Sequence, residues 1–347
     1  MGDVVPLAVA AWAGSRRRLG GALPGGVKYG FVGCAKSDFY HCDADGAVER
    51  RGAFYRGAEP SVYLPWERRL MAHPRCRLVA PRDALTAARL RRRLPASAEH
   101  RVAALGNPMM DGLEPDAAWL AAVQAFVGPD GAAVAVLPGT HSPELYQNFK
   151  ALLAVAAAVA AAAAADADGA AAGMIPPLRL LVPTTPAMSA DVLQSLLPGN
   201  ASRFRRGPDL AGGAGRTYWQ EGGGGLAVAI LDGGFAEALA ASDVAAAMAG
   251  TATEQAVGLG LRVVTLPGKG PQFGRRFAEE QARLLGRESL TLCATAEEAA
   301  AALRAAVAER GQTGRAAACR RNGSLRMGPP GAADRIADAF IRDVLRL

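Results

Sequence analysis

The sequence predicts an α/β fold in which parallel strands alternate with helices. From residue 132 onward, short apolar runs alternate with longer stretches of helix-forming residues, a rhythm typical of strand–helix–strand units. Three of the apolar runs lead directly into glycine turns. Such turns are expected where strands reach the edge of an open α/β sheet at which these folds bind ligands.

The composition agrees with a large globular chain. Its 347 residues suffice for two domains with full cores, and 50% of them are hydrophobic. The five cysteines are an odd number without a CxxC pair, so we expect free thiols in a reducing compartment rather than disulfides or zinc. No apolar run combines the length and hydrophobicity of a transmembrane span, and we see no targeting signal. We therefore expect a soluble or peripheral membrane protein.

The net charge of +7 comes mainly from arginine, with short clusters at Arg16–Arg18 and Arg91–Arg93. A basic surface attracts acidic lipids, phosphorylated sugars or nucleic acid. No nucleic-acid module or interleaved aromatic pattern accompanies the clusters, so no nucleic-acid partner is expected. We interpret the arginines as solvated helix faces, with peripheral membrane contact left open.

In residues 1–112, short apolar runs alternate with helix-forming stretches, which predicts a small Rossmann-like domain. The expected strands are Lys28–Val32, Arg77–Ala80 and Val102–Leu105, and the expected helices are Pro65–His73 and Arg82–Leu94. Residues 113–131 follow as a hinge and linker that carries a connecting helix.

Residues 132–330 predict a second Rossmann-like domain, and residues 331–347 a C-terminal helix. The expected strands are Ala132–Leu137, Leu178–Val182, Leu226–Leu231, Val244–Met248, Arg262–Leu266 and Leu290–Cys293. The alanine tract Ala154–Gly173 predicts a helix with a loose extension, and the glycine runs Gly212–Gly215 and Gly222–Gly225 predict loops. In the terminal helix Ala332–Arg346, we expect Ile336, Phe340, Val344 and Leu345 near one side.

The segment Ala249–Gly260 carries the strongest functional signal. Its Ala-Gly-Thr turn joins an apolar run to a helix, an arrangement that aims unpaired backbone N–H groups and the positive helix end at an anion. The turns Leu137-Pro138-Gly139-Thr140 and Leu266-Pro267-Gly268 repeat the pattern. A phosphate or diphosphate is the expected ligand, although each turn is also compatible with an ordinary strand-to-helix connection.

These motifs together resemble lipid-A-disaccharide synthases, and in particular the synthase-related proteins of cyanobacteria and photosynthetic eukaryotes. The shared pattern comprises YLPWERRLM from Tyr63, PRDALTAARL from Pro81, GNPMMDGL from Gly106, AGTATEQAVGLG and LPGKGPQF. The resemblance covers nearly the whole chain. It implies a GT-B fold, with two Rossmann-like domains whose parallel sheets face a cleft and the N-terminal domain on the acceptor side, and a plastid or cytoplasmic location. It also implies that the N-terminal domain is incomplete, because family members begin with a further strand and glycine-rich loop.

The resemblance assigns roles to particular residues. Those expected to contact a nucleotide sugar are Gly139, Thr140, His141, Glu144, Gly250, Thr251, Thr253, Glu254, Gln255, Gly268 and Gln272. Asp3 is the expected catalytic base, and Lys36, Ser37 and Glu67 are expected on the acceptor side. Gln281 could contact the base or sugar or simply be a solvated helix position. No metal or other cofactor is expected.

The chain departs from the synthases at two of these positions. His141 stands where they have arginine, which removes a fixed charge and a forked donor. Their acid after the Gly-Thr turn falls on Gln255, one residue beyond Glu254.

The resemblance implies inverting transfer of a sugar such as acylated glucosamine from a UDP-sugar to a lipid or sugar-phosphate acceptor, as in lipid A biosynthesis. A non-catalytic nucleotide-sugar-binding protein and a UDP-sugar 2-epimerase-like enzyme remain open as alternatives.

Overall fold

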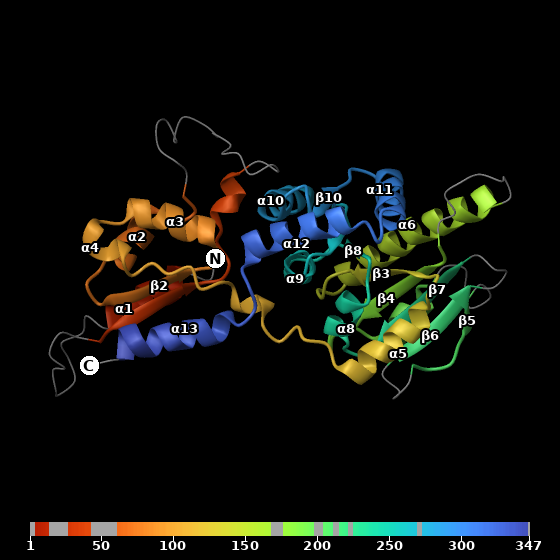
Figure 1. The fold of residues 1–347 in the computed structure, drawn as a ribbon, viewed down its shortest axis with the longest axis horizontal. Helices are drawn as coiled ribbons and strands as arrows, with labels where there is room; N and C mark the ends of the chain where they lie inside the picture. The colour runs from red at the N-terminus through yellow and green to blue at the C-terminus, as the bar shows by residue number, and fades with distance from the viewer. Residues whose placement is uncertain are drawn as a thin grey trace. The chain divides into compact units, whose positions relative to one another are not determined.

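The chain divides into two compact units in a computed structural model (Figure 1). The model describes residues 4–13, 27–42, 61–167, 176–197, 204–210, 215–220, 225–268 and 273–345. Unit 1 comprises Met1–Asp111, Arg283–Gly286 and Gly323–Leu347, and unit 2 comprises Gly112–Ala282 and Arg287–Asn322.

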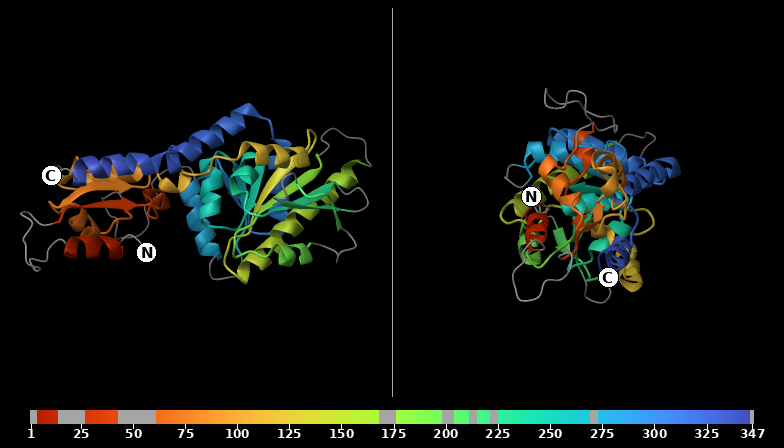
Figure 2. Two further views of the ribbon diagram at one scale, coloured as in Figure 1. Left: turned by 90° about the horizontal axis from the view of Figure 1, so that it is seen from below. Right: turned by 90° about the vertical axis from the view of Figure 1, so that its left-hand side faces the viewer.

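Unit 1 is built on a two-stranded parallel sheet. Strand β1 (Tyr29–Gly33) pairs with β2 (Cys76–Pro81). The other elements are α1 (Val4–Ala13), η1 (Asp38–His41), α2 (Pro65–Met71), α3 (Ala84–Arg93), α4 (Ala96–Glu99), η3 (Pro108–Met110), α13 (Ala332–Phe340) and the π-helical turn η6 (Ile341–Leu345). Residues of α1 to α4 share one core with Tyr29 and Phe31, while α13 and η6 pack around Leu78 on β2. Figure 2 shows α13 along the strands, opposite α1.

Unit 2 contains an eight-stranded sheet in the order β10-β9-β8-β3-β4-β7-β6-β5. Its strands are β3 (Ala132–Leu137), β4 (Leu178–Pro183), β5 (Phe204–Arg206), β6 (Gly215–Gln220), β7 (Leu226–Leu231), β8 (Val244–Ala247), β9 (Arg262–Thr265) and β10 (Leu290–Leu292). Its helices are α5 (Ala117–Val127), α6 (Glu144–Ala167), α7 (Ala190–Ser195), α8 (Phe235–Ala240), α9 (Thr251–Gly258), α10 (Arg275–Leu285) and α11 (Ala296–Ala308), and α12 (Thr313–Met327) begins here. All pairings are parallel except those of β5 with β6 and β6 with β7.

Helices cover both faces of this sheet, which explains its nearly continuous apolar strands. Along β3, Val134 and Val136 enter the larger core with α6 and α11, whereas Ala133 faces the smaller core with α5 and α8. The α/β class with parallel-dominated sheets, expected from the sequence, is therefore confirmed.

The structure corrects three local expectations. Val102–Leu105 is not a strand, because Val102 makes only an isolated bridge to Val79. The antiparallel edge strands β5 and β6 were not expected, since their arginines and glycine interrupt the apolar pattern of a buried strand. Leu345 is 59% exposed although Val344 is buried, because the π-helical turn shifts the register of the last residues.

No segment with the length and hydrophobicity of a membrane span was expected from the sequence, but part of helix α6 meets these two criteria. Within the part of the chain that the structure describes, Glu144–Ala163 is long and apolar enough to cross a membrane by length and composition, with a mean hydropathy of 1.4. Half of this window is buried inside the protein, and side chains such as Phe149 and Leu152 belong to the larger core of unit 2. This packing accounts for the apolar face of α6 as that of a core helix.

Candidate functional site

The carboxyl ends of three neighbouring strands carry the glycine turns singled out in the sequence. Strands β3, β8 and β9 are adjacent and parallel, so Leu137, Ala247 and Thr265 end at the same edge of the sheet. At this edge, two of the turns line a cavity of about 250 Å³. The lining residues are Pro138, Gly139, Thr140, His141, Glu144, Leu145, Asn148, Met248, Ala249, Gly250, Thr251, Ala252, Phe273 and Phe277.

Glycines bring the turns close together. Gly139 has φ +88°, a conformation that favours glycine, and a Cβ there would lie 3.2 Å from the carbonyl oxygen of Met248. A Cβ at Gly268 would lie 2.9 Å from Asn148 Oδ1. Larger residues at either position would therefore push the turns apart.

Three helices begin at this cavity. Glu144 opens α6, Thr251 and Ala252 open α9, and Phe277 lies in the first turn of α10. The first N–H groups of a helix have no partner within it, and each helix start carries about half a positive charge. Gly250, the N-cap of α9, supplies no side chain to occupy these groups. The edge is therefore suited to an anion.

Buried side chains hold the α9 turn in place. Gln281 is only 2% exposed, and its Nε2 donates to the carbonyl oxygens of Ala249 at 3.0 Å and Gly250 at 3.1 Å. The solvated interpretation of Gln281 is therefore wrong. The Thr253 hydroxyl donates to the Ala249 carbonyl at 2.6 Å and is fully buried, so it is engaged within the turn rather than directed at a ligand.

The structure gathers only some of the predicted residues. Those that line the cavity are Gly139, Thr140, His141, Glu144, Gly250 and Thr251. Those that do not are Thr253, Glu254, Gln255 and Gly268. Asp3 and Gln272 lie outside the described residues.

The cavity also contains residues that the motifs did not reveal. Asn148 lies one helical turn beyond Glu144 and donates to the Pro138 carbonyl at 3.0 Å, which ties α6 to the first turn. Phe273 and Phe277 form a tilted aromatic pair with centroids 5.4 Å apart. Phe277 is 39% exposed, so it offers an accessible aromatic surface beside the anion-binding edge. In the sequence, only the spacing of four residues between Glu144 and Asn148, and between Phe273 and Phe277, could have indicated that these side chains lie together.

The predicted acceptor-side residues of unit 1 are engaged with the protein itself. Ser37 and Glu67 are fully buried; Ser37 Oγ donates to Asp83 Oδ2 at 2.7 Å, and Glu67 Oε2 accepts from the Leu64 N–H at 2.7 Å. Lys36 is partly exposed and forms an ion pair with Glu67. These contacts explain how the residues stabilise the start of η1 and α2, and Lys36 remains accessible to solvent.

Beside them, Asp38 is a buried carboxyl group. Its Oδ1 accepts from the Val62 N–H at 2.7 Å, while its Oδ2 has no hydrogen-bond partner among the described residues. Burial raises the pKa of Asp38 from 3.8 to about 6, against the lowering effects of the Val62 N–H and Arg89.

Similarity to known proteins is found among solved structures and not among family models or curated sequences. No protein-family model matches the chain, and a comparison with curated proteins found no similar sequence. Among solved structures, the chain is similar to a protein of Listeria monocytogenes described as a UDP-N-acetylglucosamine 2-epimerase (TM-score 0.47, 12% identity), covering 90% of this chain and 67% of that one. It is also similar to S. aureus MnaA in a structure with UDP (0.40, 13%, covering 91% and 68%) and to Acinetobacter baumannii MurG (0.40, 14%, covering 84% and 82%). With TM-scores below 0.5, these similarities carry no argument about the fold family or the ligand of this chain.

Proposed function

We propose that the cavity at the ends of β3 and β8 binds the diphosphate of a UDP-sugar, and that the chain is a GT-B-type glycosyltransferase related to lipid-A-disaccharide synthases. The observation that carries the proposal is the meeting of three helix starts and two glycine turns at one cavity. The sequence resemblance supplies the identity of the nucleotide sugar.

The cavity is too small to enclose a complete UDP-sugar. About 250 Å³ lies below the range of roughly 300–1,000 Å³ that holds a complete small ligand. It therefore suits the diphosphate and part of its neighbour, with Thr140 and Thr251 as exposed hydroxyl donors and Phe277 as an aromatic wall. Backbone N–H groups at this position would stabilise the charge that develops on the leaving UDP.

The transfer step would be inverting, from a donor such as a UDP-linked acylated glucosamine to a lipid or sugar-phosphate acceptor. It needs a base for the acceptor hydroxyl, the role that the resemblance gives to Asp3. Lys36 is the acceptor-side candidate with a solvent-accessible charge.

A non-catalytic nucleotide-sugar-binding protein is the second candidate. The described lining of the cavity contains neither lysine nor arginine, and His141 stands where the synthases have arginine. Without that fixed charge, stabilisation of the leaving diphosphate is weaker, which favours binding without turnover.

Calorimetric titration of the full chain with UDP, UMP and uridine tests the binding proposal. We expect UDP to bind at least about tenfold more tightly than uridine, because the site recognises the diphosphate. Absence of UDP binding at millimolar concentration would overturn the proposal. Incubation with UDP-diacylglucosamine and a monosaccharide phosphate then separates the two candidates: a disaccharide product identifies the transferase, and UDP binding without product identifies the non-catalytic protein.

A further inference from the structure

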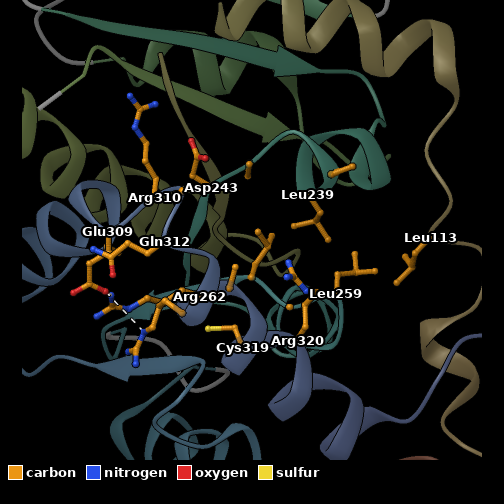
Figure 3. A pocket seen from close by; sticks show the side chains of 18 of the residues that line it. Leu113, Leu239, Asp243, Leu259, Arg262, Glu309, Arg310, Gln312, Cys319 and Arg320 are labelled. Atoms are coloured by element: carbon orange, nitrogen blue, oxygen red, sulfur yellow. Dashed lines mark hydrogen bonds and ion pairs between the residues drawn. The ribbon is translucent and has the colours of Figure 1, made fainter. Parts of the chain in front are cut away.

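A second cavity, of about 460 Å³, lies at the opposite edge of the unit 2 sheet, where β8 and β9 begin (Figure 3). Its volume falls within the range of small-molecule sites. The ends of α8, α9 and α11 and one face of α12 surround it. None of the sequence motifs accounts for this cavity.

The face that α12 turns toward the cavity has an unusual composition for a packed helix. Gln312, immediately before the helix, and Arg315, Ala316, Cys319 and Arg320 follow the spacing i, i+3, i+4, i+7, i+8 and all line the cavity. This spacing marks a single helix face, which in a packed helix is apolar. Here it carries two arginines and a glutamine, so this face borders a cavity rather than a packed apolar core.

Two of the cavity's four arginines have structural partners. The C-terminal ends of α8, α9 and α11 carry partial negative charge, which attracts cations. Arg310 Nη1 donates to the Gly131 carbonyl at 2.9 Å, and Arg262 Nη1 pairs with Glu309 Oε2 at 2.6 Å. These two arginines therefore have roles in the fold.

The other two are far less engaged. Arg315 forms two long ion pairs, with Glu288 at 3.6 Å and with Glu309 at 3.8 Å, both beyond hydrogen-bond distance, and its buried Nε has no hydrogen-bond partner among the described residues. Arg320 is exposed and has neither a hydrogen bond nor an ion pair within the described ranges. Arg320 thus supplies positive charge at the cavity that no described residue pairs with.

The turn after α9 positions Arg320. Gly260 has φ +90°, and a Cβ there would lie 2.5 Å from Arg320 Cγ. Only glycine allows the aliphatic stem of Arg320 to lie against this turn. Figure 3 shows Arg320 on the same side of the cavity as Leu239 and Leu259, with the Arg262–Glu309 pair, Arg310 and Gln312 on the other side.

We propose that this cavity binds a small organic anion with an apolar body. Its carboxylate or phosphate group pairs with Arg320 and Arg315, and its hydrocarbon part lies against Leu113, Leu239 and Leu259. A charge-assisted hydrogen bond supplies the head-group affinity, and removal of apolar surface from water supplies the rest. The site shares no residue with the first cavity, so the two ligands would not compete for the same side chains.

Octanoate, octyl phosphate, octan-1-ol and inorganic phosphate serve as probes in calorimetric titrations of the full chain. We expect one of the two amphiphilic anions to bind at least about tenfold more tightly than either the neutral alcohol or inorganic phosphate, because the site needs both charge and apolar surface. The tighter of the two anions identifies the head group. Absence of binding by both up to about 10 mM, or equal binding of octanol, would overturn the proposal.

A pair of charge-matched variants locates the site. Arg320→Gln removes the charge and leaves a shorter polar side chain, and Arg321→Gln makes the same change at the neighbouring exposed residue, which does not line the cavity. We expect only Arg320→Gln to weaken binding of the anion, by about tenfold or more, with UDP binding unchanged. Equal effects of the two variants would place the anion elsewhere and refute the assignment.

Discussion

A carboxylate placed at the first residue of α9 should weaken diphosphate binding without weakening the fold. Thr251 is exposed, lines the first cavity and follows the N-cap Gly250. Aspartate in the first turn of a helix is favourable by roughly 0.3–1 kcal/mol, because it interacts with the positive end of the helix. Thr251→Asp is therefore expected to be as stable as the parent or slightly more stable.

The same carboxylate should repel a diphosphate in the cavity. For a ligand bearing about two negative charges at about 5 Å, the repulsion is about 2 kcal/mol even at the dielectric constant of water, and larger in a partly enclosed site. Since 1.4 kcal/mol corresponds to tenfold, the affinity for UDP should fall by at least about tenfold. Because the substitution should lower the affinity for UDP without lowering the stability of the fold, a loss of binding cannot be attributed to unfolding.

Calorimetry with UDP and thermal unfolding measure the two quantities on the same samples. Thr251→Asn is the matched control, because it has nearly the shape of aspartate without its charge. We expect the asparagine variant to bind UDP within a few-fold of the parent. Unchanged UDP affinity in Thr251→Asp, or an equal loss in both variants, would show that the start of α9 does not face the diphosphate.

Four further predictions concern the two units. Gln281→Leu removes both hydrogen bonds to the α9 turn, so we expect a loss of about 1–3 kcal/mol in the free energy of unfolding together with weaker UDP binding, measured by denaturant titration and calorimetry. Gly139→Ala and Gly112→Ala both place a side chain at positive φ and should each cost about 1 kcal/mol of stability, but only the former, in the cavity, should weaken UDP binding; equal UDP affinities would contradict the role of that turn. Because burial raises the pKa of Asp38 from 3.8 to about 6, its contribution to stability is fully present only below the unfolded pKa and is lost as the pH rises through the folded value; Asp38→Asn should therefore gain about 3 kcal/mol relative to the parent between about pH 3 and about pH 8 in unfolding experiments, and a pH-independent difference would refute this. His141→Arg adds a fixed charge at the cavity, so UDP should bind several-fold more tightly, with His141→Gln as the uncharged comparison.

The predictability of the fold depended on how completely each strand is buried. Strands β3, β4 and β7 are covered on both faces, so they read as continuous apolar runs and their positions were confirmed. Strand β6 lies towards the edge of the sheet, where Trp219 is 38% exposed, and its alternation of polar and apolar residues is too short to stand out. Pairing with β7 rather than local composition specifies that strand.

Some residues of the candidate site could be identified from local sequence, and others are placed only by long-range packing. Glycine turns have a local signature, so Gly139 and Gly250 were identifiable from the sequence as members of one sheet edge. The contribution of Gln281 depends on how α10 packs against the α9 turn, a long-range contact that no local pattern reports. Thr253 shows the converse case, because its hydroxyl fits the diphosphate motif in sequence but bonds to the preceding turn in the structure.

The electrostatics of the first cavity connect its structure to the choice between catalysis and binding. The starts of α6, α9 and α10 contribute roughly half a positive charge each, and the described lining has no lysine or arginine to add to them. Such partial charges are fixed to the backbone, so they interact more strongly with the diphosphate as negative charge develops on it during departure from the sugar. Rate acceleration requires stronger interaction with the developing charge than with the bound substrate. The Glu144 carboxylate at the start of α6 opposes these partial charges, and no cationic side chain of the described lining offsets it. Under the proposed function, the cavity therefore favours nucleotide binding more clearly than rapid turnover.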